Sequence, residues 1–222
     1  MSLAAGGAAA TAATADGSAS KFGGDCLEWQ MQCLADSALL LQDFRTAYET
    51  YGILATDYKA AKTAGHYHAH ALLLRALCSA LADAPRREVE AALDAAYSQA
   101  LRAGLPGKAM SVTLLHLELS RRLPRLARPR DAATALVRCS TEVTNLPAAL
   151  LLEQAALCHL RASAPPPASP ATPAAGGLGV VGERKSAFLL VLAGYRYVQA
   201  GFRAHAVRCY AAALTQYAGG CM

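Results

Sequence analysis

Small and large side chains recur at fixed intervals between Leu190 and Leu214, and this pattern restricts the possible folds more than any other feature of the sequence. The positions that carry it are Ala193, Gly194, Tyr197, Gly201, Ala206, Tyr210 and Ala213. Such spacing is typical of a tetratricopeptide (TPR) hairpin, in which two antiparallel helices touch where small residues allow a close approach. We expect Gly194 and Ala206 at the close contact. Tyr197 and Tyr210 would fill the space beside it, and Gly201 would allow the tight turn between the helices.

A second copy of the pattern lies near the start of the chain. It consists of Met31, Leu34, Ala35, Ala38, Ala47, Tyr51, Leu54 and Ala55, with Gln42 to Phe44 in place of the turn glycine. One such hairpin cannot bury its own apolar face, so it requires neighbours stacked on either side. The two copies therefore predict a TPR-like α-solenoid of antiparallel helical hairpins.

The composition favours an all-α fold. Hydrophobic residues make up 54% of the 222 residues but aromatic residues only 6%, because alanine supplies much of the apolar content. Alanine is the best helix former, whereas strands favour β-branched and aromatic residues. Helical spacing of apolar residues predicts a helix that starts near Asp25, and further helices at about 45–61, 68–81, 86–103, 109–122, 130–143 and 148–162.

These patterns divide the chain into four parts. We expect residues 1–24 to form a disordered Ala/Ser/Thr-rich tail, because they have too little bulky apolar surface to offset the entropy of ordering. Residues 25–163 are expected to form the helical-repeat solenoid. Residues 164–184 form a Pro/Ala/Gly-rich insert that we expect to be a disordered loop without a helix, because proline and glycine interrupt it. Residues 185–222 hold the TPR-like hairpin that continues the solenoid.

Charge and cysteine content set limits on partners and location. The net charge is +5, and the arginines are densest between Arg121 and Arg130. This run could contact phosphates of nucleic acid or of an acidic membrane, but Pro124 and Pro129 favour a solvated loop, and we expect no nucleic-acid partner. The seven cysteines include no CxxC pair, which favours a reducing compartment. We find neither an apolar run long enough to cross a membrane nor a convincing secretory signal, so we expect a cytoplasmic location.

No catalytic, cofactor or metal site stands out. His66 and His70 have the spacing of a two-histidine metal site, but His68 lies on another face and no third ligand follows. Glu118 and Glu153 are isolated carboxylates without a partner detectable in the sequence. The glycine-rich stretch 176–182 lacks the strand and the Gly-Lys-Ser/Thr ending of a phosphate-binding loop. The sequence therefore predicts a protein that is not an enzyme.

Four blocks, taken together, resemble a known family. They are Ala35–Tyr58 (ADSALLLQDFRTAYETYGILATDY), Leu150–Ala156 (LLLEQAA), Lys185–Gly194 (KSAFLLVLAG) and His205–Tyr210 (HAVRCY). Their order and approximate spacing are similar, over residues 26–218, to the subunit 8 family of the transport protein particle (TRAPP) complex. The resemblance is to a central, TPR-like segment only.

The resemblance implies an α-solenoid part of the TRAPP III assembly, which tethers vesicles and activates a Rab GTPase in ER–Golgi traffic and autophagy. Nucleotide exchange belongs to other subunits, so this chain would be a non-catalytic scaffold that meets the Rab GTPase only indirectly. The implied partners are other TRAPP subunits, with room for a peripheral contact with Golgi or pre-autophagosomal membranes. The alternative is an independent TPR-type adaptor that binds peptide or protein partners in its concave groove.

Overall fold

The computed structural model of the protein describes residues 26–61, 64–163 and 176–219. Within these ranges the chain is helical and contains no β-strand, which confirms the all-α prediction. The expected tail at 1–24, and residues 164–175 of the expected insert, lie outside the described residues. The helices in chain order are α1 (Leu27–Leu40), α2 (Phe44–Ala60), α3 (Gly65–Leu81), α4 (Arg86–Arg102), α5 (Pro106–Arg122), the short 3-10 helix η2 (Pro124–Leu126), α6 (Pro129–Ser140), α7 (Asn145–Ser163), α8 (Gly176–Gln199) and α9 (Arg203–Gly219).

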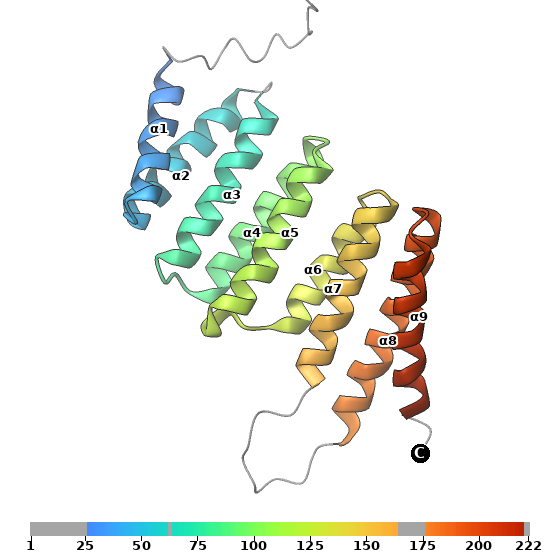
Figure 1. Cartoon of the computed structure of the whole chain (residues 1–222). Coiled ribbons are helices and arrows are strands. Elements are labelled where there is room, and N and C mark those ends of the chain that lie inside the picture. The colour runs from blue at the N-terminus through green and yellow to red at the C-terminus, as the bar shows by residue number, and fades with distance from the viewer. Residues whose placement is uncertain (1–25, 62–63, 164–175, 220–222) are drawn as a thin grey trace, which may run out of the picture.

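The helices stack in chain order, each against the next. Figure 1 shows a row that runs from α1 to α9, in which the odd-numbered helices lie toward the viewer and the even-numbered helices behind them. This two-layer row is the arrangement expected of an α-solenoid, because each hairpin buries its apolar faces against the hairpins beside it.

Four of the turns between helices share one backbone geometry. Each contains one residue with positive φ, and these residues are Gln42 (φ 64°), Asp83 (φ 58°), Gly104 (φ 69°) and Gly201 (φ 83°). The amide that follows this residue donates to a carbonyl five residues back, as in Asp43 N to Ala38 O and Phe202 N to Tyr197 O, both 2.9 Å. This pattern is the Schellman motif, which satisfies a carbonyl at the end of a helix while the chain reverses. Gln42 thus adopts the same left-handed conformation as Gly201.

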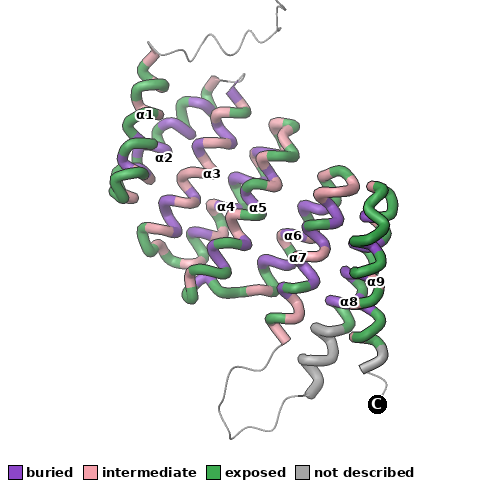
Figure 2. The backbone as a smooth tube through the Cα atoms, viewed as in Figure 1, coloured by how far each residue is buried: buried purple, intermediate pink, exposed green. Residues whose placement is uncertain are grey.

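The core is built largely from alanine and divides into two clusters. The smaller cluster packs α1, α2 and α3 around Tyr51 and Leu54, which are fully buried. The larger cluster runs from α3 to α9 and includes Leu136 and Tyr197. Helix α3 contributes Ala71 to the first cluster and Ala76 to the second. Figure 2 shows buried segments where neighbouring helices face each other along the row.

The start of α8 differs from the sequence prediction. The insert was expected to contain no helix as far as residue 184, but α8 already begins at Gly176, so this part of the prediction is wrong. The prolines of the insert end at Pro173, and the stretch that follows is interrupted by glycine alone. Glycine weakens a helix by about 1 kcal/mol per residue but leaves its hydrogen bonds intact, whereas proline removes one. A helix held by its buried part can therefore extend through glycines that a propensity argument would exclude.

Candidate interaction surfaces

The C-terminal hairpin places its predicted pattern residues at the contact between α8 and α9. Ala193, Gly194, Tyr197, Ala206 and Ala213 are buried, and Tyr210 is half-buried. A Cβ atom at Gly194 would lie 2.5 Å from Cε1 of Tyr210, so the tyrosine ring occupies the space that the missing side chain leaves. The three atoms nearest to this Cβ position therefore all belong to Tyr210. Gly201 lies in the turn and is exposed.

The N-terminal hairpin buries most, but not all, of its predicted pattern residues. Ala35, Ala47 and Tyr51 are fully buried. The Tyr51 hydroxyl donates to the Asp36 carboxylate. Burial is the main cause that raises the pKa of Tyr51, and this hydrogen bond is the second. Leu34 belongs to the predicted pattern but is not buried, because 56% of its surface is exposed. It lies on α1, which packs against α2, and no other described helix covers its outer face.

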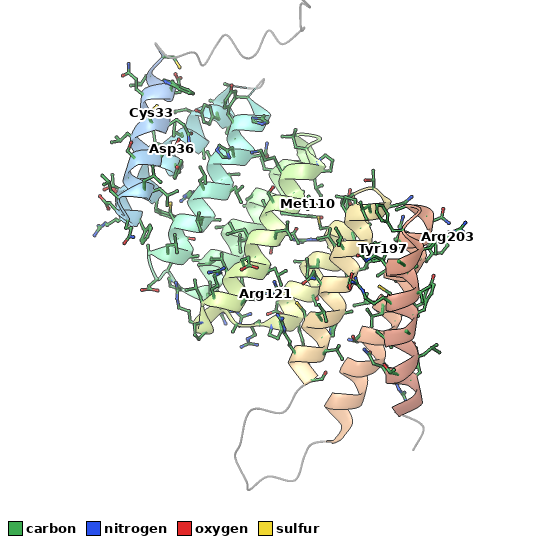
Figure 3. The ribbon with its side chains drawn as sticks, in the orientation of Figure 1. Cys33, Asp36, Met110, Arg121, Tyr197 and Arg203 are labelled. Carbon is green, nitrogen blue, oxygen red and sulfur yellow. The ribbon has the colours of Figure 1, made fainter. Side chains whose placement is uncertain are left out.

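A polar contact that the sequence did not reveal ties α7, α8 and α9 together. The Tyr197 hydroxyl donates to Oε2 of Glu153 at 2.8 Å, and the Arg208 guanidinium donates to Oε1 at 2.8 Å. Figure 3 shows Tyr197 in the region between α7 and α9. Burial, with the bond to Glu153 as the next contribution, raises the pKa of Tyr197. Glu153 was expected to be isolated, but its partners are 44 and 55 residues away in the chain, which sequence spacing cannot show.

Several arginines of the run from Arg121 to Arg130 make contacts within the protein. Arg121 donates to Glu118 and to Gln154, and Arg125 donates to the carbonyl oxygens of Ala80 and Ala84. The run was expected to be a solvated loop, but it spans the end of α5, the helix η2 and the start of α6. Glu118 likewise has partners, because it pairs with Arg121 and Arg122.

The exposed large apolar side chains gather at the two ends of the row. We define the C-terminal end face by those of α8, α9 and the turn between them, and the N-terminal end face by those of α1 and Leu41. The first set is Phe188, Val191, Leu192, Tyr195, Val198, Phe202, Val207, Leu214 and Tyr217, and the second is Leu27, Trp29, Leu34, Leu40 and Leu41. The middle of the row, from α2 to α7, contributes Ile53, Leu114, Leu150 and Leu157. Each C-terminal helix therefore presents an apolar stripe at helical spacing that no described helix covers.

The groove between α4 and α6 is polar, and its charges are paired. It has a volume of about 440 Å³, with His116 of α5 on its lining. Arg86 pairs with Glu90 at 2.6 Å and with Asp131 at 2.7 Å, and Arg138 pairs with Asp94 at 2.8 Å. The pairs Arg86–Asp131 and Arg138–Asp94 connect α4 to α6, and each arginine of the groove has a carboxylate partner.

The described part of the chain contains no cluster of three or more His, Cys, Asp and Glu side chains able to hold a metal ion. His66 is exposed and His68 is buried, while His70 is half-buried. Burial raises the pKa of the Cys78 thiol to about 11 and also raises the pKa values of Cys139, Cys158 and Cys209. These four thiols are consequently neutral near pH 7 and pack as small apolar groups. Within the same residues, no helix combines the length and the apolar character that crossing a bilayer requires.

Comparison with known proteins connects this row of helices to a family. A model of the family described as "ER-Golgi trafficking TRAPP I complex 85 kDa subunit" matches residues 4–124, which is more than half of the chain. The chain belongs to this family. The human trafficking protein particle complex subunit 8 is 32% identical to it over 195 residues.

The similarity to the human family member extends over nearly all of the chain but little of the relative. The alignment covers 86% of this chain and 12% of the human protein. The predicted membership of the TRAPP subunit 8 family is therefore confirmed. The family description names the TRAPP I complex, whereas the sequence resemblance implied TRAPP III.

Proposed function

We propose that this chain is a non-catalytic scaffold segment of a TRAPP III-type complex, which tethers vesicles and promotes nucleotide exchange on a Rab GTPase in ER–Golgi traffic and autophagy. Its direct partners are other TRAPP subunits, and it acts on the Rab GTPase through the complex. Its place is the cytoplasm, peripheral to Golgi and pre-autophagosomal membranes. Family membership carries this proposal.

The distribution of apolar surface supports a scaffold role. The C-terminal end face presents bulky side chains that no described helix covers, including Tyr195 and Val207. Removing such surface from water is favourable by about 25 cal/mol per Å², so a partner helix that covers it gains binding energy. Aromatic side chains are also enriched at the centres of protein interfaces. We propose that another TRAPP subunit docks on this face.

Affinity purification tests the proposal. The tagged chain, expressed in cells whose intact TRAPP complex survives lysis, is expected to recover other TRAPP subunits, detected by mass spectrometry. The double variant Tyr195→Lys, Val207→Lys is expected to lose them, because two charges would have to be buried in the interface. Ile53→Lys is the matched control, because Ile53 is 53% exposed and lies on α2, away from this face. Circular dichroism checks that all three chains retain their helices.

Two results would count against the proposal at different levels. If the unaltered chain recovers no other TRAPP subunit, the scaffold role itself is wrong. If the double variant recovers the same subunits as the Ile53→Lys control, the role stands but the docking face lies elsewhere on the row.

A further inference from the structure

A second polar pocket lies on the face of the row formed by the even-numbered helices, and its chemistry differs from that of the α4–α6 groove. It has a volume of about 360 Å³. Its walls come from the last turns of α2 and α4, and its floor from the first turns of α3. The lining residues are Tyr58, Lys59, Ala61, Gly65, His68, Leu72, Ala95, Gln99 and Arg102.

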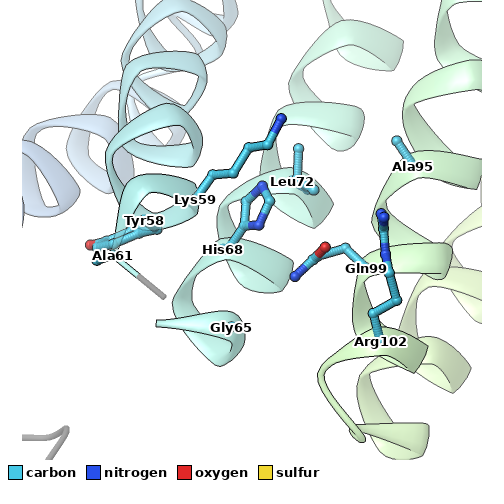
Figure 4. Close-up of a pocket in the computed structure, with 9 residues that line it drawn as sticks. All are labelled: Tyr58, Lys59, Ala61, Gly65, His68, Leu72, Ala95, Gln99 and Arg102. Atoms are coloured by element: carbon cyan, nitrogen blue, oxygen red, sulfur yellow. The ribbon is translucent and has the colours of Figure 1, made fainter. Parts of the chain in front are cut away.

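Apart from Tyr58, the polar side chains that line this pocket bear nitrogen, and they come from three helices. Figure 4 shows His68 of α3 in the centre, with Lys59 of α2 on one side and Gln99 and Arg102 of α4 on the other. His68 is about nine-tenths buried, so the ring is fixed by packing at the base of the pocket. Lys59 and Arg102 are exposed, so their side chains are free to turn toward a ligand in the pocket.

No carboxylate described in the structure neutralises these cations. Asp and Glu are absent from the lining, and neither Lys59 nor Arg102 takes part in an ion pair among the described residues. The α4–α6 groove is the internal contrast, since Arg86 and Arg138 each have a carboxylate partner there. Burial lowers the pKa of His68, and the positive charges of Lys59 and Arg102 lower it further. Two cations thus act on one buried imidazole without a compensating charge.

We propose that this pocket binds a small phosphate monoester, whose phosphate group contacts Lys59, Arg102 and the His68 ring. A flexible ammonium and a planar guanidinium are both well suited to phosphate oxygens. The Gln99 amide can donate a further hydrogen bond. The pocket is larger than a phosphate ion, so it also has room for the polyol or sugar that carries the group. The proposal is independent of the scaffold role and of the C-terminal end face.

Titration of the folded full chain with inorganic phosphate, followed by calorimetry and by NMR of the histidine ring signals, tests this site. We expect saturable binding and a shift of the His68 signals, which the variant His68→Gln identifies. Lys59→Gln and Arg102→Gln are each expected to weaken binding roughly tenfold, the effect of losing one charged hydrogen bond. Arg87→Gln is the matched control, because Arg87 is also an exposed arginine of α4 but lies outside the pocket.

A second experiment, with lipid vesicles, distinguishes a lipid headgroup from a soluble phosphate ester as the ligand. Co-sedimentation with phosphatidylcholine vesicles that contain a phosphatidylinositol monophosphate, and loss of it in Lys59→Gln, would assign the pocket to a lipid headgroup. Phosphate binding without co-sedimentation would assign it to a soluble phosphate ester. The proposal is overturned if the folded chain binds no phosphate, or if the double variant Lys59→Gln, Arg102→Gln binds it as tightly as the Arg87→Gln control.

Discussion

At the scale of single residues, the contact between Gly194 and Tyr210 decides how closely α8 approaches α9. We expect Gly194→Ala to lower the free energy of unfolding by about 1–3 kcal/mol, the usual cost of overpacking a core. The added Cβ would lie 2.5 to 2.9 Å from three ring atoms of Tyr210, so the ring or the helix must shift. Urea denaturation followed by circular dichroism measures the change.

Two further variants separate this contact from helix propensity. Gly107→Ala on α5 adds the same atom where nothing lies within 4 Å, so it is expected to be neutral or slightly stabilising. Combining Gly194→Ala with Tyr210→Leu should recover part of the loss, because leucine does not extend as far as the ring. Equal destabilisation by Gly194→Ala and Gly107→Ala would show that the close approach has no energetic importance.

At the scale of elements, Arg125 on η2 connects the α5–α6 corner to the end of α3. Its guanidinium donates to the carbonyl oxygens of Ala84, at 2.7 Å, and Ala80, and it pairs with Asp83 at 2.9 Å. The carbonyl of Ala80 belongs to the last turn of α3, where a cation also interacts favourably with the helix dipole.

We expect Arg125→Ala to lower the free energy of unfolding by about 1–2 kcal/mol, because two carbonyls lose a charged donor. Arg128→Ala, three residues further along the same arginine run, is the control, since no hydrogen bond or ion pair of the Arg128 side chain is described. Thermal unfolding of both variants checks this. If both unfolding midpoints shift equally, the contact of Arg125 with α3 does not contribute to the stability of the fold.

How far the sequence predicts each element depends on the range of the forces involved. Apolar spacing located α2 well, at 45–61 against the observed Phe44–Ala60, because helix formation depends on neighbours within one or two turns. The same spacing could not say which face of α1 is covered, and Leu34 of the predicted pattern is exposed. The Glu153–Arg208 pair and the pocket between α2, α3 and α4 could not be predicted either, because their residues come together only when the helices stack.

At the scale of the whole molecule, buried histidines make stability depend on pH. Burial lowers the pKa values of His68, His70, His116 and His159 below the usual 6.5, although Glu90, Asp94 and Asp131 partly offset the effect at His116 and Arg138 adds to it. Below pH 6.5 these histidines become protonated in the unfolded chain while they are still neutral in the folded chain. The free energy of unfolding that the neutral histidines contribute is therefore fully present above that pH, and it falls as the pH decreases toward the folded pKa values.

We expect the unfolding temperature to fall between about pH 6.5 and about pH 5, before most carboxylates titrate. Scanning calorimetry across this window measures the fall. His116→Gln should reduce the pH dependence, and His66→Gln, at an exposed position on α3, is the matched control. An unfolding temperature that stays constant across the window would contradict the prediction.

The division of the core into two clusters decides how far the effect of a substitution extends along the row. Helix α3 belongs to both clusters, whereas α1 and α2 pack only within the smaller one among the described residues. A substitution in the core of α3 therefore acts on the packing of both clusters, whereas one in α1 or α2 acts on the smaller cluster alone.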